Sequence, residues 1–465
     1  MKINKYFLAV IILTIVALII RIYNISYNSI WSDEEFTLTF SKQSFYDIFF
    51  GIIAGEFNPP IFFWIEHIVH LTIGIETEFK LRIASAIFGA LTIPIFYLIG
   101  KEIYNEKGGL IISTLVTFST FHIFYSQEAR AYTLMLLFIS LSTLYFIKII
   151  KSENAVENKN WILFATFSAL AFWTHFYSFV FTICSFLYGI IFKRNLYKIW
   201  GKSIILYSWL SLPIVIIAMS LLEWRVTAPI TYGYKGFILV KYIIEQFLEY
   251  NTISTALFVY LTMFGLLYLI TKRRDVLKLC GFYFIAVILI SVILSYVFPF
   301  MPKYTIFLLP FFYVLCAGAY YFFERYISPQ KAFPIFMIVC IVASVWVLGF
   351  YYTKPSKDDW RSFSNELAQL TKDGDNVIIS ANTIEPVLRY YYNSTLDNTT
   401  VIPLPLTRAA IEGYYYNNTK PTYIILHGLS VMPNNDLREW MNSHTEYITS
   451  YQNIELFFLN PNLIN

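Results

Sequence analysis

The chain has 465 residues, of which 57% are hydrophobic and 20% aromatic, while only 14% are charged. Soluble domains carry about 25% charged residues, so this composition excludes a soluble protein and indicates a polytopic membrane protein. The net charge of +4 is modest, and no basic tract resembles a nucleic-acid-binding arm. We therefore expect membrane lipid, and not nucleic acid, as a partner.

Apolar segments approach the roughly 20 residues that a helix needs to cross a bilayer. We expect about eleven transmembrane helices, near residues 6–23, 81–100, 108–124, 131–150, 160–175, 176–192, 203–222, 252–271, 279–298, 304–323 and 332–351. The basic connections between them are 101–107, 148–159, 193–202, 272–278 and 324–331. Placing these connections, together with Lys2 and Lys5, in the cytoplasm puts the N-terminus inside and the C-terminus outside.

Residues 61–74 do not fit this transmembrane topology. The segment IFFWIEHIVHLTIG is apolar, yet it contains Glu66, His67 and His70. A span here would invert every later loop and place the basic connections outside. We therefore predict an amphipathic helix in the outer interface, within a large external loop over 24–80 that holds juxtamembrane helices. A short spanning helix is the alternative.

The composition changes after Tyr352, where the chain becomes polar. Short apolar runs predict strands at 377–380, 400–404, 423–427 and 455–459, and these alternate with the helix-like stretches DWRSFSNELAQL and NNDLREWMNSH. Such alternation is typical of a small α/β domain. The expected architecture is thus an all-α membrane domain over 1–353, followed by an extracytoplasmic α/β domain over 354–465.

An acidic cluster follows the first span, in WSDEEFTLTF at 31–40. Asp33, Glu34 and Glu35 stand there against an aromatic and apolar background. Crowded carboxylates beside a low-dielectric boundary have raised or coupled pKa values, and such values suit a general base. The alternative is a helix start, in which Ser32 or Asp33 caps the first turn.

Two further external stretches carry cations at the membrane boundary. YSQEARAYTL at 125–134 contains Glu128 and Arg130, and FPFMPKYTIFLLP at 298–310 contains Lys303. Charges at this boundary are expensive unless they are paired or used. The Arg130 guanidinium suits a phosphate, which it can bind through two parallel hydrogen bonds, and Lys303 suits an anionic headgroup. A local ion pair for Arg130 and snorkelling for Lys303 are the alternatives.

His175, in WTHFYS at 173–178, is a candidate metal ligand or supporting residue. A single histidine at a helix end is more often structural. His67 and His70 belong to another helix, and no spacing among the three specifies a zinc site.

In their order and spacing these motifs resemble the GT-C superfamily, in particular the branch of the protein O-mannosyltransferases and the lipid A aminoarabinose transferases, which is like glycosyltransferase family 39. The resemblance rests on SIWSDEEFTL, FNPPIFFWIEHIVHLTIG with the Arg-led span after it, YSQEARAYTL, MPKYTIFLLP and DDWRSFSNEL. One departure is Asn58 before the two prolines, where relatives often have His or Lys. A neutral amide can bind the donor but carries no charge.

The resemblance implies an inverting transfer of a sugar from a polyprenyl-phosphate donor to a protein, lipid or glycan acceptor on the outer face. Asp33 would be the base, Glu34 would help to shape the site, and Glu128 would be the second acidic position. The implied donor-phosphate contacts are Arg130, Lys303, Asn58 and Arg82. Supporting positions around them are His175, Tyr132 and Tyr304.

Two questions stay open at the level of sequence. Some members of the superfamily use a divalent metal ion, for which Glu128 or His175 would be candidates, but no motif assigns a cofactor. The competing functional class is a lipid or sugar transporter or flippase. Transporters usually show repeated halves and polar residues at mid-membrane, whereas this chain has no internal repeat and gathers its ionisable groups at one face. A catalytically inactive receptor or scaffold is a third class.

Overall fold

The computed structural model describes residues 5–51, 58–152, 159–227, 232–353, 355–380, 384–392, 399–428 and 435–460. Lys2 and the middle of the connection 148–159 lie outside these ranges. The chain divides into two compact units. The first comprises Met1–Ile25 and Phe40–Thr353, and the second comprises Ser26–Thr39 and Lys354–Asn465. The acidic segment near the N-terminus therefore groups with the C-terminal part of the chain.

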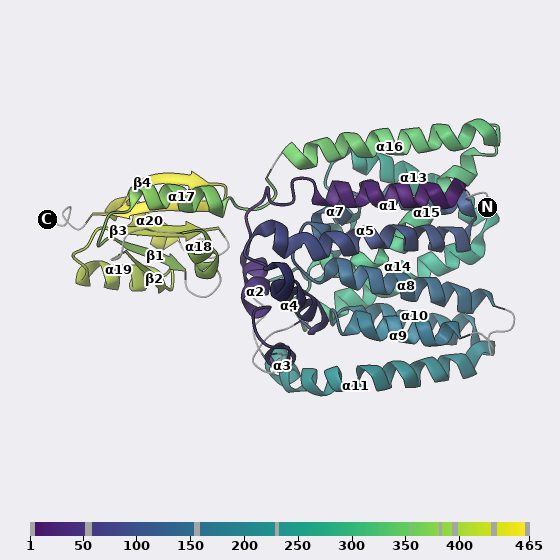
Figure 1. Ribbon diagram of the computed structural model, residues 1–465, viewed down its shortest axis with the longest axis horizontal. Coiled ribbons are helices and arrows are strands. Elements are labelled where there is room, and N and C mark those ends of the chain that lie inside the picture. The colour runs from purple at the N-terminus through teal and green to yellow at the C-terminus, as the bar shows by residue number, and fades with distance from the viewer. Residues whose placement is uncertain are drawn as a thin grey trace. The chain divides into compact units, whose positions relative to one another are not determined.

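The first unit, called the membrane unit below, is a bundle of long apolar helices (Figure 1). Its helices are α1 (Lys5–Ile22), α3 (Phe45–Phe50), α4 (Ile61–Ile73), α5 (Glu78–Ile103), α6 (Glu106–Phe118), α7 (Thr120–Ser126), α8 (Tyr132–Lys151), α9 (Asn160–Phe172), α10 (Ser178–Phe192), α11 (Tyr197–Thr227), α12 (Gly236–Phe247), α13 (Thr252–Lys272), α14 (Arg274–Leu294), α15 (Leu309–Phe323) and α16 (Pro329–Thr353). Two 3₁₀ helices, η1 (Arg194–Leu196) and η2 (Pro302–Leu308), precede α11 and α15.

Among the described residues, eight helices are long and apolar enough to cross a membrane, or nine when the bent pair α6–α7 counts as one span. All eleven predicted segments are helical, but α9 and α10 have only 13 and 15 residues. At 1.5 Å per residue they reach roughly 20 and 23 Å, which is short of the ~30 Å hydrocarbon core. The polytopic architecture is confirmed, and the count of eleven full-length spans is not.

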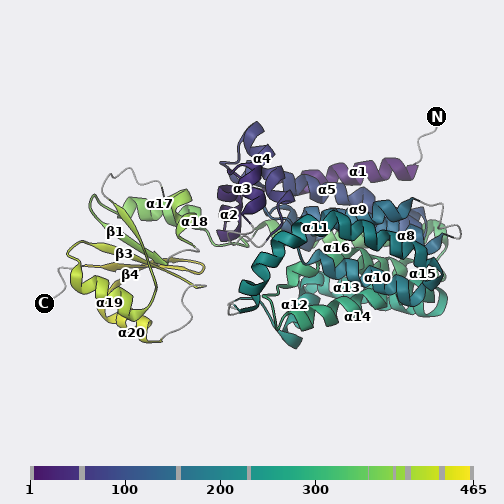
Figure 2. The same cartoon turned by 90° about the horizontal axis from the view of Figure 1, so that it is seen from below.

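Helix α4 covers the segment 61–74, which sequence alone predicted to be interfacial. It is a 13-residue helix that ends at Gly74, whose φ of 79° suits glycine. Figures 1 and 2 place it beside α3, at the end of the bundle where α5 begins. A helix of this length reaches roughly 20 Å and is too short to span a bilayer, as expected for a juxtamembrane helix.

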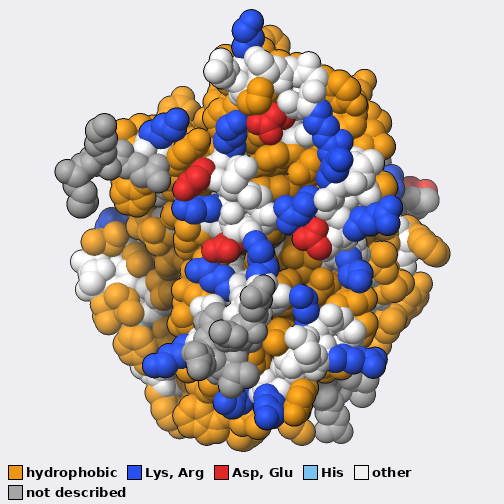
Figure 3. Space-filling view, turned by 90° about the vertical axis from the view of Figure 1, so that its right-hand side faces the viewer, with side chains coloured by type: hydrophobic (Ala, Val, Ile, Leu, Met, Phe, Trp, Pro, Cys, Tyr) orange, Lys and Arg blue, Asp and Glu red, His pale blue; other side chains and the backbone are white. Residues whose placement is uncertain are grey.

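The opposite end of the bundle is basic. Figure 3 shows Lys and Arg side chains gathered on the face where α5 and α8 finish. Two acids on this face are paired with lysines, because Lys101 lies 2.7 Å from Glu106 and Lys107 lies 3.0 Å from Glu324. The basic connections predicted from sequence thus meet on one side of the bundle.

Helices α6 and α7 form one helix that is bent by 59° at a break next to Ser119. Such a break frees backbone carbonyls that a bilayer interior cannot solvate. The guanidinium of Arg21, fully buried on α1, donates hydrogen bonds to the carbonyls of Val116 and Thr117 at 3.1 and 3.2 Å. A cation therefore satisfies the carbonyl end of α6.

An acidic side chain accepts hydrogen bonds on the other side of the break. Glu249, which follows α12, accepts hydrogen bonds from the hydroxyls of Ser119 and Thr120 at 2.7 and 2.9 Å. Its φ of 62° lies in the left-handed region, which is uncommon for a residue other than glycine. The two hydrogen bonds hold the chain in this turn, so the break is fixed from both sides.

The second unit contains a five-stranded mixed sheet in the order β2-β1-β3-β5-β4. The strands are β1 (Asn376–Ser380), β2 (Thr400–Leu404), β3 (Thr422–His427), β4 (Glu446–Tyr451) and β5 (Ile454–Leu459). β1 pairs in parallel with β2 and β3, while β5 runs antiparallel to β3 and β4. The helices are α2 (Ser32–Phe40, all but its last residue in this unit), α17 (Trp360–Leu370), α18 (Glu385–Tyr391), α19 (Arg408–Asn417) and α20 (Asn435–His444).

The predicted small α/β fold and its four strands are confirmed. Strand β4 was missed because it is largely exposed, at the edge of the sheet, and lacks the apolar run that marked the other strands. Helices α18 and α19 were missed as well, since tyrosines and charged residues blur their apolar periodicity.

Candidate active site

Lys303 and three aromatic residues named from sequence meet at one end of the membrane unit. The Lys303 ammonium lies 5.0 Å from the centre of the Tyr132 ring, and its side chain is 9% exposed. The His175 ring lies 5.6 Å from Tyr132 and 5.1 Å from Tyr304, between ring centres. These residues come from η2, the start of α8 and the connection between α9 and α10. They form what we call the cation–aromatic cluster.

The connection between α7 and α8 carries Glu128 and Arg130, both largely buried. The backbone N–H of Arg130 donates to the Glu128 carbonyl at 2.8 Å, which makes the connection a tight turn. Gln127 fastens this turn to the end of α1, because its amide donates to the carbonyls of Arg21 and Tyr23 at 3.0 and 2.8 Å. The broken helix and the end of α1 therefore set the position of Glu128 and Arg130.

Arg130 joins the cluster through His175. Both Arg130 and Lys303 are close enough to the His175 imidazole to interact with it electrostatically. Two largely buried cations therefore lie near one imidazole ring. A phosphate group has the charge and the oxygen atoms to bind both of them.

Tyr177 is a member of the cluster that sequence reasoning missed. Its ring stacks on Tyr304, with 4.6 Å between the centres and 15° between the planes. Its hydroxyl donates to the Pro299 carbonyl at 2.6 Å, and its backbone N–H donates to His175 Nδ1 at 3.3 Å. Tyr177 therefore ties the histidine to the segment that carries Lys303. The available signal was its place two residues after His175 in WTHFYS.

Tyr125 and Gln246 extend the cluster towards α12, a helix that the sequence did not reveal. The Tyr125 ring lies 5.1 Å from Tyr132, and its hydroxyl accepts a hydrogen bond from the Gln246 amide at 2.8 Å. Lys303 and Glu128 both interact electrostatically with Tyr125. Lys303 and Glu128 are thus both near Tyr125.

The two remaining phosphate candidates lie on other elements. Arg82, buried on α5, donates to the Ile25 carbonyl at 2.8 Å, so part of its hydrogen-bonding capacity holds the end of the first span. Asn58 is half-buried before α4. The first residue of that helix, Ile61, donates its N–H to the Trp173 carbonyl at 3.3 Å, next to the His175 connection. Phosphate contacts for Arg82 and Asn58 stay predictions.

The acidic motif belongs to the second unit. Asp33, Glu34 and Glu35 occupy the first turn of α2. Glu34 is fully buried, and its carboxylate lies 2.8 Å from the ammonium of Lys357. Asp33 is only half-buried. The adjacent carboxylates thus occupy different environments, and Lys357 is a partner that sequence reasoning missed although it directly precedes the DDWRSFSNEL motif.

The described ranges contain no set of side chains that could bind a metal ion. No group of three or more His, Cys, Asp or Glu side chains that could hold a metal ion occurs among the described residues. The metal candidates Glu128 and His175 belong to no such group within these ranges.

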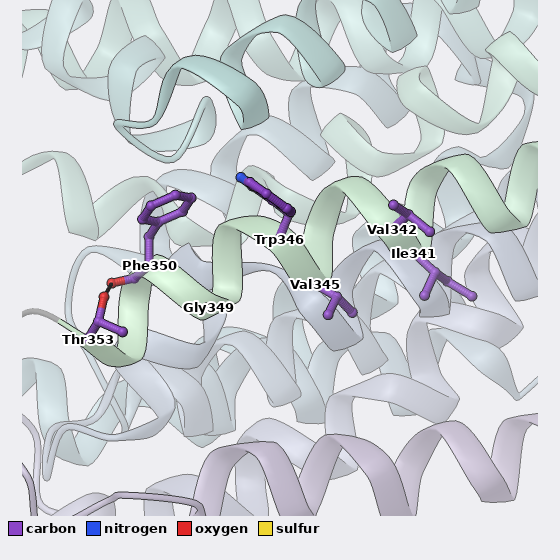
Figure 4. Close-up of a pocket in the computed structure, with 7 residues that line it drawn as sticks. All are labelled: Ile341, Val342, Val345, Trp346, Gly349, Phe350 and Thr353. Carbon is purple, nitrogen blue, oxygen red and sulfur yellow. Dashed lines mark hydrogen bonds between the residues drawn. The ribbon is translucent and has the colours of Figure 1, made fainter.

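A cavity of about 660 Å³ lies along α16, and none of these polar residues lines it (Figure 4). It is lined by Ile341, Val342, Val345, Trp346, Gly349, Phe350 and Thr353. Trp346 is 59% exposed, and none of the lining residues is titratable. The cavity is a groove in an apolar surface and not a catalytic pocket.

Comparisons with known proteins agree with these features. Residues 58–224 match the family described as dolichyl-phosphate-mannose-protein mannosyltransferase. ArnT from Cupriavidus metallidurans, solved bound to undecaprenyl phosphate, aligns with a TM-score of 0.59 and 11% identity over 97% of each chain. The Archaeoglobus fulgidus oligosaccharyltransferase, solved with Zn and sulfate, aligns with a TM-score of 0.55 and 12% identity over 96% of this chain and 73% of that one. No curated protein sequence matches the chain.

At these identities the solved structures establish the fold alone, and they do so for nearly the whole chain. The family match covers the stretch that includes α4, the Glu128–Arg130 turn and the His175 connection. The resemblance drawn from the motifs is thereby confirmed. Residues 58–224, just over a third of the chain, match the dolichyl-phosphate-mannose-protein mannosyltransferase family, and the chain shares its fold with the ArnT and oligosaccharyltransferase structures.

Proposed function

We propose that the protein transfers a sugar from a polyprenyl-phosphate-linked donor to an acceptor on the outer face of the membrane, with inversion at the anomeric carbon. The observation that carries this proposal is the cation–aromatic cluster. In it Lys303 stands over Tyr132 and shares His175 with Arg130. Such a pair of largely buried cations at a membrane boundary suits a lipid phosphate, and the ArnT structure of the same fold holds undecaprenyl phosphate.

The chemistry of such a donor assigns the roles. The leaving group is a phosphate that is already anionic, so it needs cations more than a general acid. Arg130 and Lys303 bind it, and the bond between the anomeric carbon and the phosphate oxygen breaks with its electron pair leaving on that oxygen. Asp33 takes the proton of the acceptor hydroxyl or amine. The new bond forms on the opposite face of the sugar, which inverts the anomeric centre.

The placement of charge supports an extracytoplasmic site. The basic face lies where α5 and α8 finish, whereas the cation–aromatic cluster lies where α8 begins. By the positive-inside rule the basic face is cytoplasmic, and the cluster is therefore outside. Cysteines introduced at Lys80 and Lys151, at opposite ends of the bundle, test this orientation. An impermeant thiol reagent should label only the first in intact cells, and the reverse pattern would invert the topology.

Reconstitution in proteoliposomes tests the function. The vesicles should contain a polyprenyl-phosphate sugar labelled in the sugar, and an extract of envelope protein, lipid and glycan should be supplied as acceptor. We expect label to move from the lipid fraction to the acceptor with release of polyprenyl phosphate. A flippase would instead move intact donor between leaflets. Intact donor that changes leaflet, with no label on any acceptor, would contradict the proposal.

A further inference from the structure

The segment before the acidic motif is built into the second unit. The backbone N–H of Ile30 donates to the Tyr391 hydroxyl at 2.8 Å. Arg361 contributes two hydrogen bonds, from its N–H to the Ser29 hydroxyl at 3.1 Å and from its guanidinium to the Ser26 carbonyl at 2.9 Å. Residues far apart in the sequence thereby fix the path of the chain into α2.

One buried ion pair completes this attachment. Lys357 and Glu34 lie 2.8 Å apart, with side chains that are 9% and 0% exposed. The Lys357 ammonium also lies 5.8 Å from the centre of the Trp31 ring, just before α2. A buried ion pair loses stability when one of its members is removed, so this pair strongly favours one placement of α2.

The geometry of a helix links this pair to Asp33. Consecutive residues of an α-helix point about 100° apart around its axis. The Glu34 carboxylate points to Lys357, and Asp33 is only half-buried on the same turn. Fixing the direction of Glu34 therefore fixes the rotation of α2 and with it the direction of the Asp33 carboxylate.

We infer that Lys357 and Glu34 are a positioning pair that orients the Asp33 carboxylate, so that Glu34 acts through Asp33 and not on the substrate. The inference rests on the proposed function, in which Asp33 is the base. It also gives the second unit a role in the reaction, because Lys357 of that unit holds α2 in place.

Kinetics of sugar transfer test the pair through matched variants. Lys357→Met should lower kcat by about 10²-fold, the effect of a misplaced catalytic group, and leave the KM for the lipid donor unchanged. Lys357→Arg should keep most of the activity. The double variant Glu34→Met/Lys357→Met, which removes both members of the pair, should be more active than either single variant. A double variant no better than Glu34→Met would show that Glu34 itself serves the chemistry.

The control is an ion pair elsewhere in the same unit. Arg438 lies 2.5 Å from Glu455 in an exposed pair, so Arg438→Met should leave kcat and KM unchanged. Thermal unfolding of each purified variant shows whether it is folded. Equal losses in Arg438→Met and Lys357→Met would overturn the inference, since they would indicate a general disturbance of the unit.

A second readout does not need activity. The four native cysteines are buried, so a cysteine placed at Asp33 can be labelled against a low background. Its rate of reaction with a thiol reagent should change when Lys357→Met is added, because the cysteine then points in another direction, and should stay constant when Arg438→Met is added. An unchanged rate with Lys357→Met would overturn the positioning role. Absence of sugar transfer by the unaltered protein would refute the proposed function and leave this labelling test in force.

Discussion

The two units use buried charge differently. In the membrane unit, Arg21 and Glu249 bind backbone carbonyls and hydroxyls on the two sides of the α6–α7 break. In the second unit, Glu34 and Lys357 bind each other. A bilayer offers no water to a broken helix, so side chains must satisfy what the break exposes. In the second unit the strands of the sheet satisfy one another's backbone groups, and the buried Glu34 carboxylate is bound by the Lys357 ammonium.

The difference indicates what each charge controls. A charge bound to the backbone sets the shape of the chain, as at the break that leads into the Glu128–Arg130 turn. A charge bound to another side chain sets the direction of a helix, as at α2. Substitutions in the membrane unit should therefore act first on donor binding, and those in α2 should act first on the chemical step.

The largest expected effect is that of Asp33→Asn on the chemical step. The substitution keeps size and hydrogen bonding and removes the base, so the transfer rate should fall by about 10²–10⁴-fold. Donor affinity should change little, because the phosphate candidates lie in the membrane unit. Single-turnover kinetics and donor binding to the same preparation measure the two quantities. A folded Asp33→Asn protein with near-normal turnover would move the base assignment to Glu34 or Glu128.

Arg130→Ala, in the membrane unit, should weaken binding of the lipid donor. Loss of a largely buried phosphate contact should weaken donor binding by about 2–5 kcal/mol. Lys303→Arg is the matched variant, since it keeps the cation over Tyr132 and should retain most activity. Titration with labelled polyprenyl phosphate gives the affinities. Equal affinity of Arg130→Ala and the unaltered protein would reduce Arg130 to a structural role.

Glu249→Gln probes the broken helix with a smaller change. The amide can still accept a hydrogen bond from Ser119 or Thr120, but without charge, so stability should fall by about 1 kcal/mol. Thr143→Val is the control, because the buried Thr143 hydroxyl has no hydrogen-bond partner among the described residues. Thermal unfolding in one detergent compares the two variants. Similar unfolding temperatures for both would show that the carboxylate does not support the break.

The smallest expected effect is a loss of stability of the second unit at acidic pH. Partial burial raises the pKa of Asp358, but hydrogen bonds from His427 and Asn453 outweigh it and hold this pKa below the usual value. Because the folded pKa is depressed, Asp358 contributes stability above its unfolded pKa of about 3.9, and this contribution is lost as the pH falls through the folded value. Tryptophan fluorescence should show a smaller loss of stability between pH 5 and pH 3 in Asp358→Asn. The same pH dependence in both proteins would exclude this contribution.

The sequence predicted what depends on local pattern. Apolar length revealed the segments of the bundle, and apolar runs revealed four of the five strands in the described sheet. The motifs also named Lys303, Tyr132, His175 and Tyr304, which the structure brings together. Their catalytic roles, like that of Asp33, stay predictions.

Other features depend on contacts that no local pattern encodes. The bend at Ser119 is stabilised by the hydrogen bonds of Arg21 and Glu249, which are far from it in the sequence. The pairing of Glu34 with Lys357 joins segments from opposite ends of the chain. In the sequence, Tyr177 looks like any aromatic residue at a membrane interface. Only its stacking on Tyr304 shows that it belongs to the cation–aromatic cluster.

The grouping of Ser26–Thr39 with Lys354–Asn465 also determines when the acidic segment can assume its final form. The ribosome must add roughly 300 residues between the two parts, which takes about 15–60 s at 5–20 residues per second. During that interval the first helices can enter the membrane, but Glu34 has yet to meet Lys357. A nascent chain that stops before Lys354 would therefore carry the residues proposed to bind the donor phosphate, but it would lack Lys357, which we propose orients Asp33.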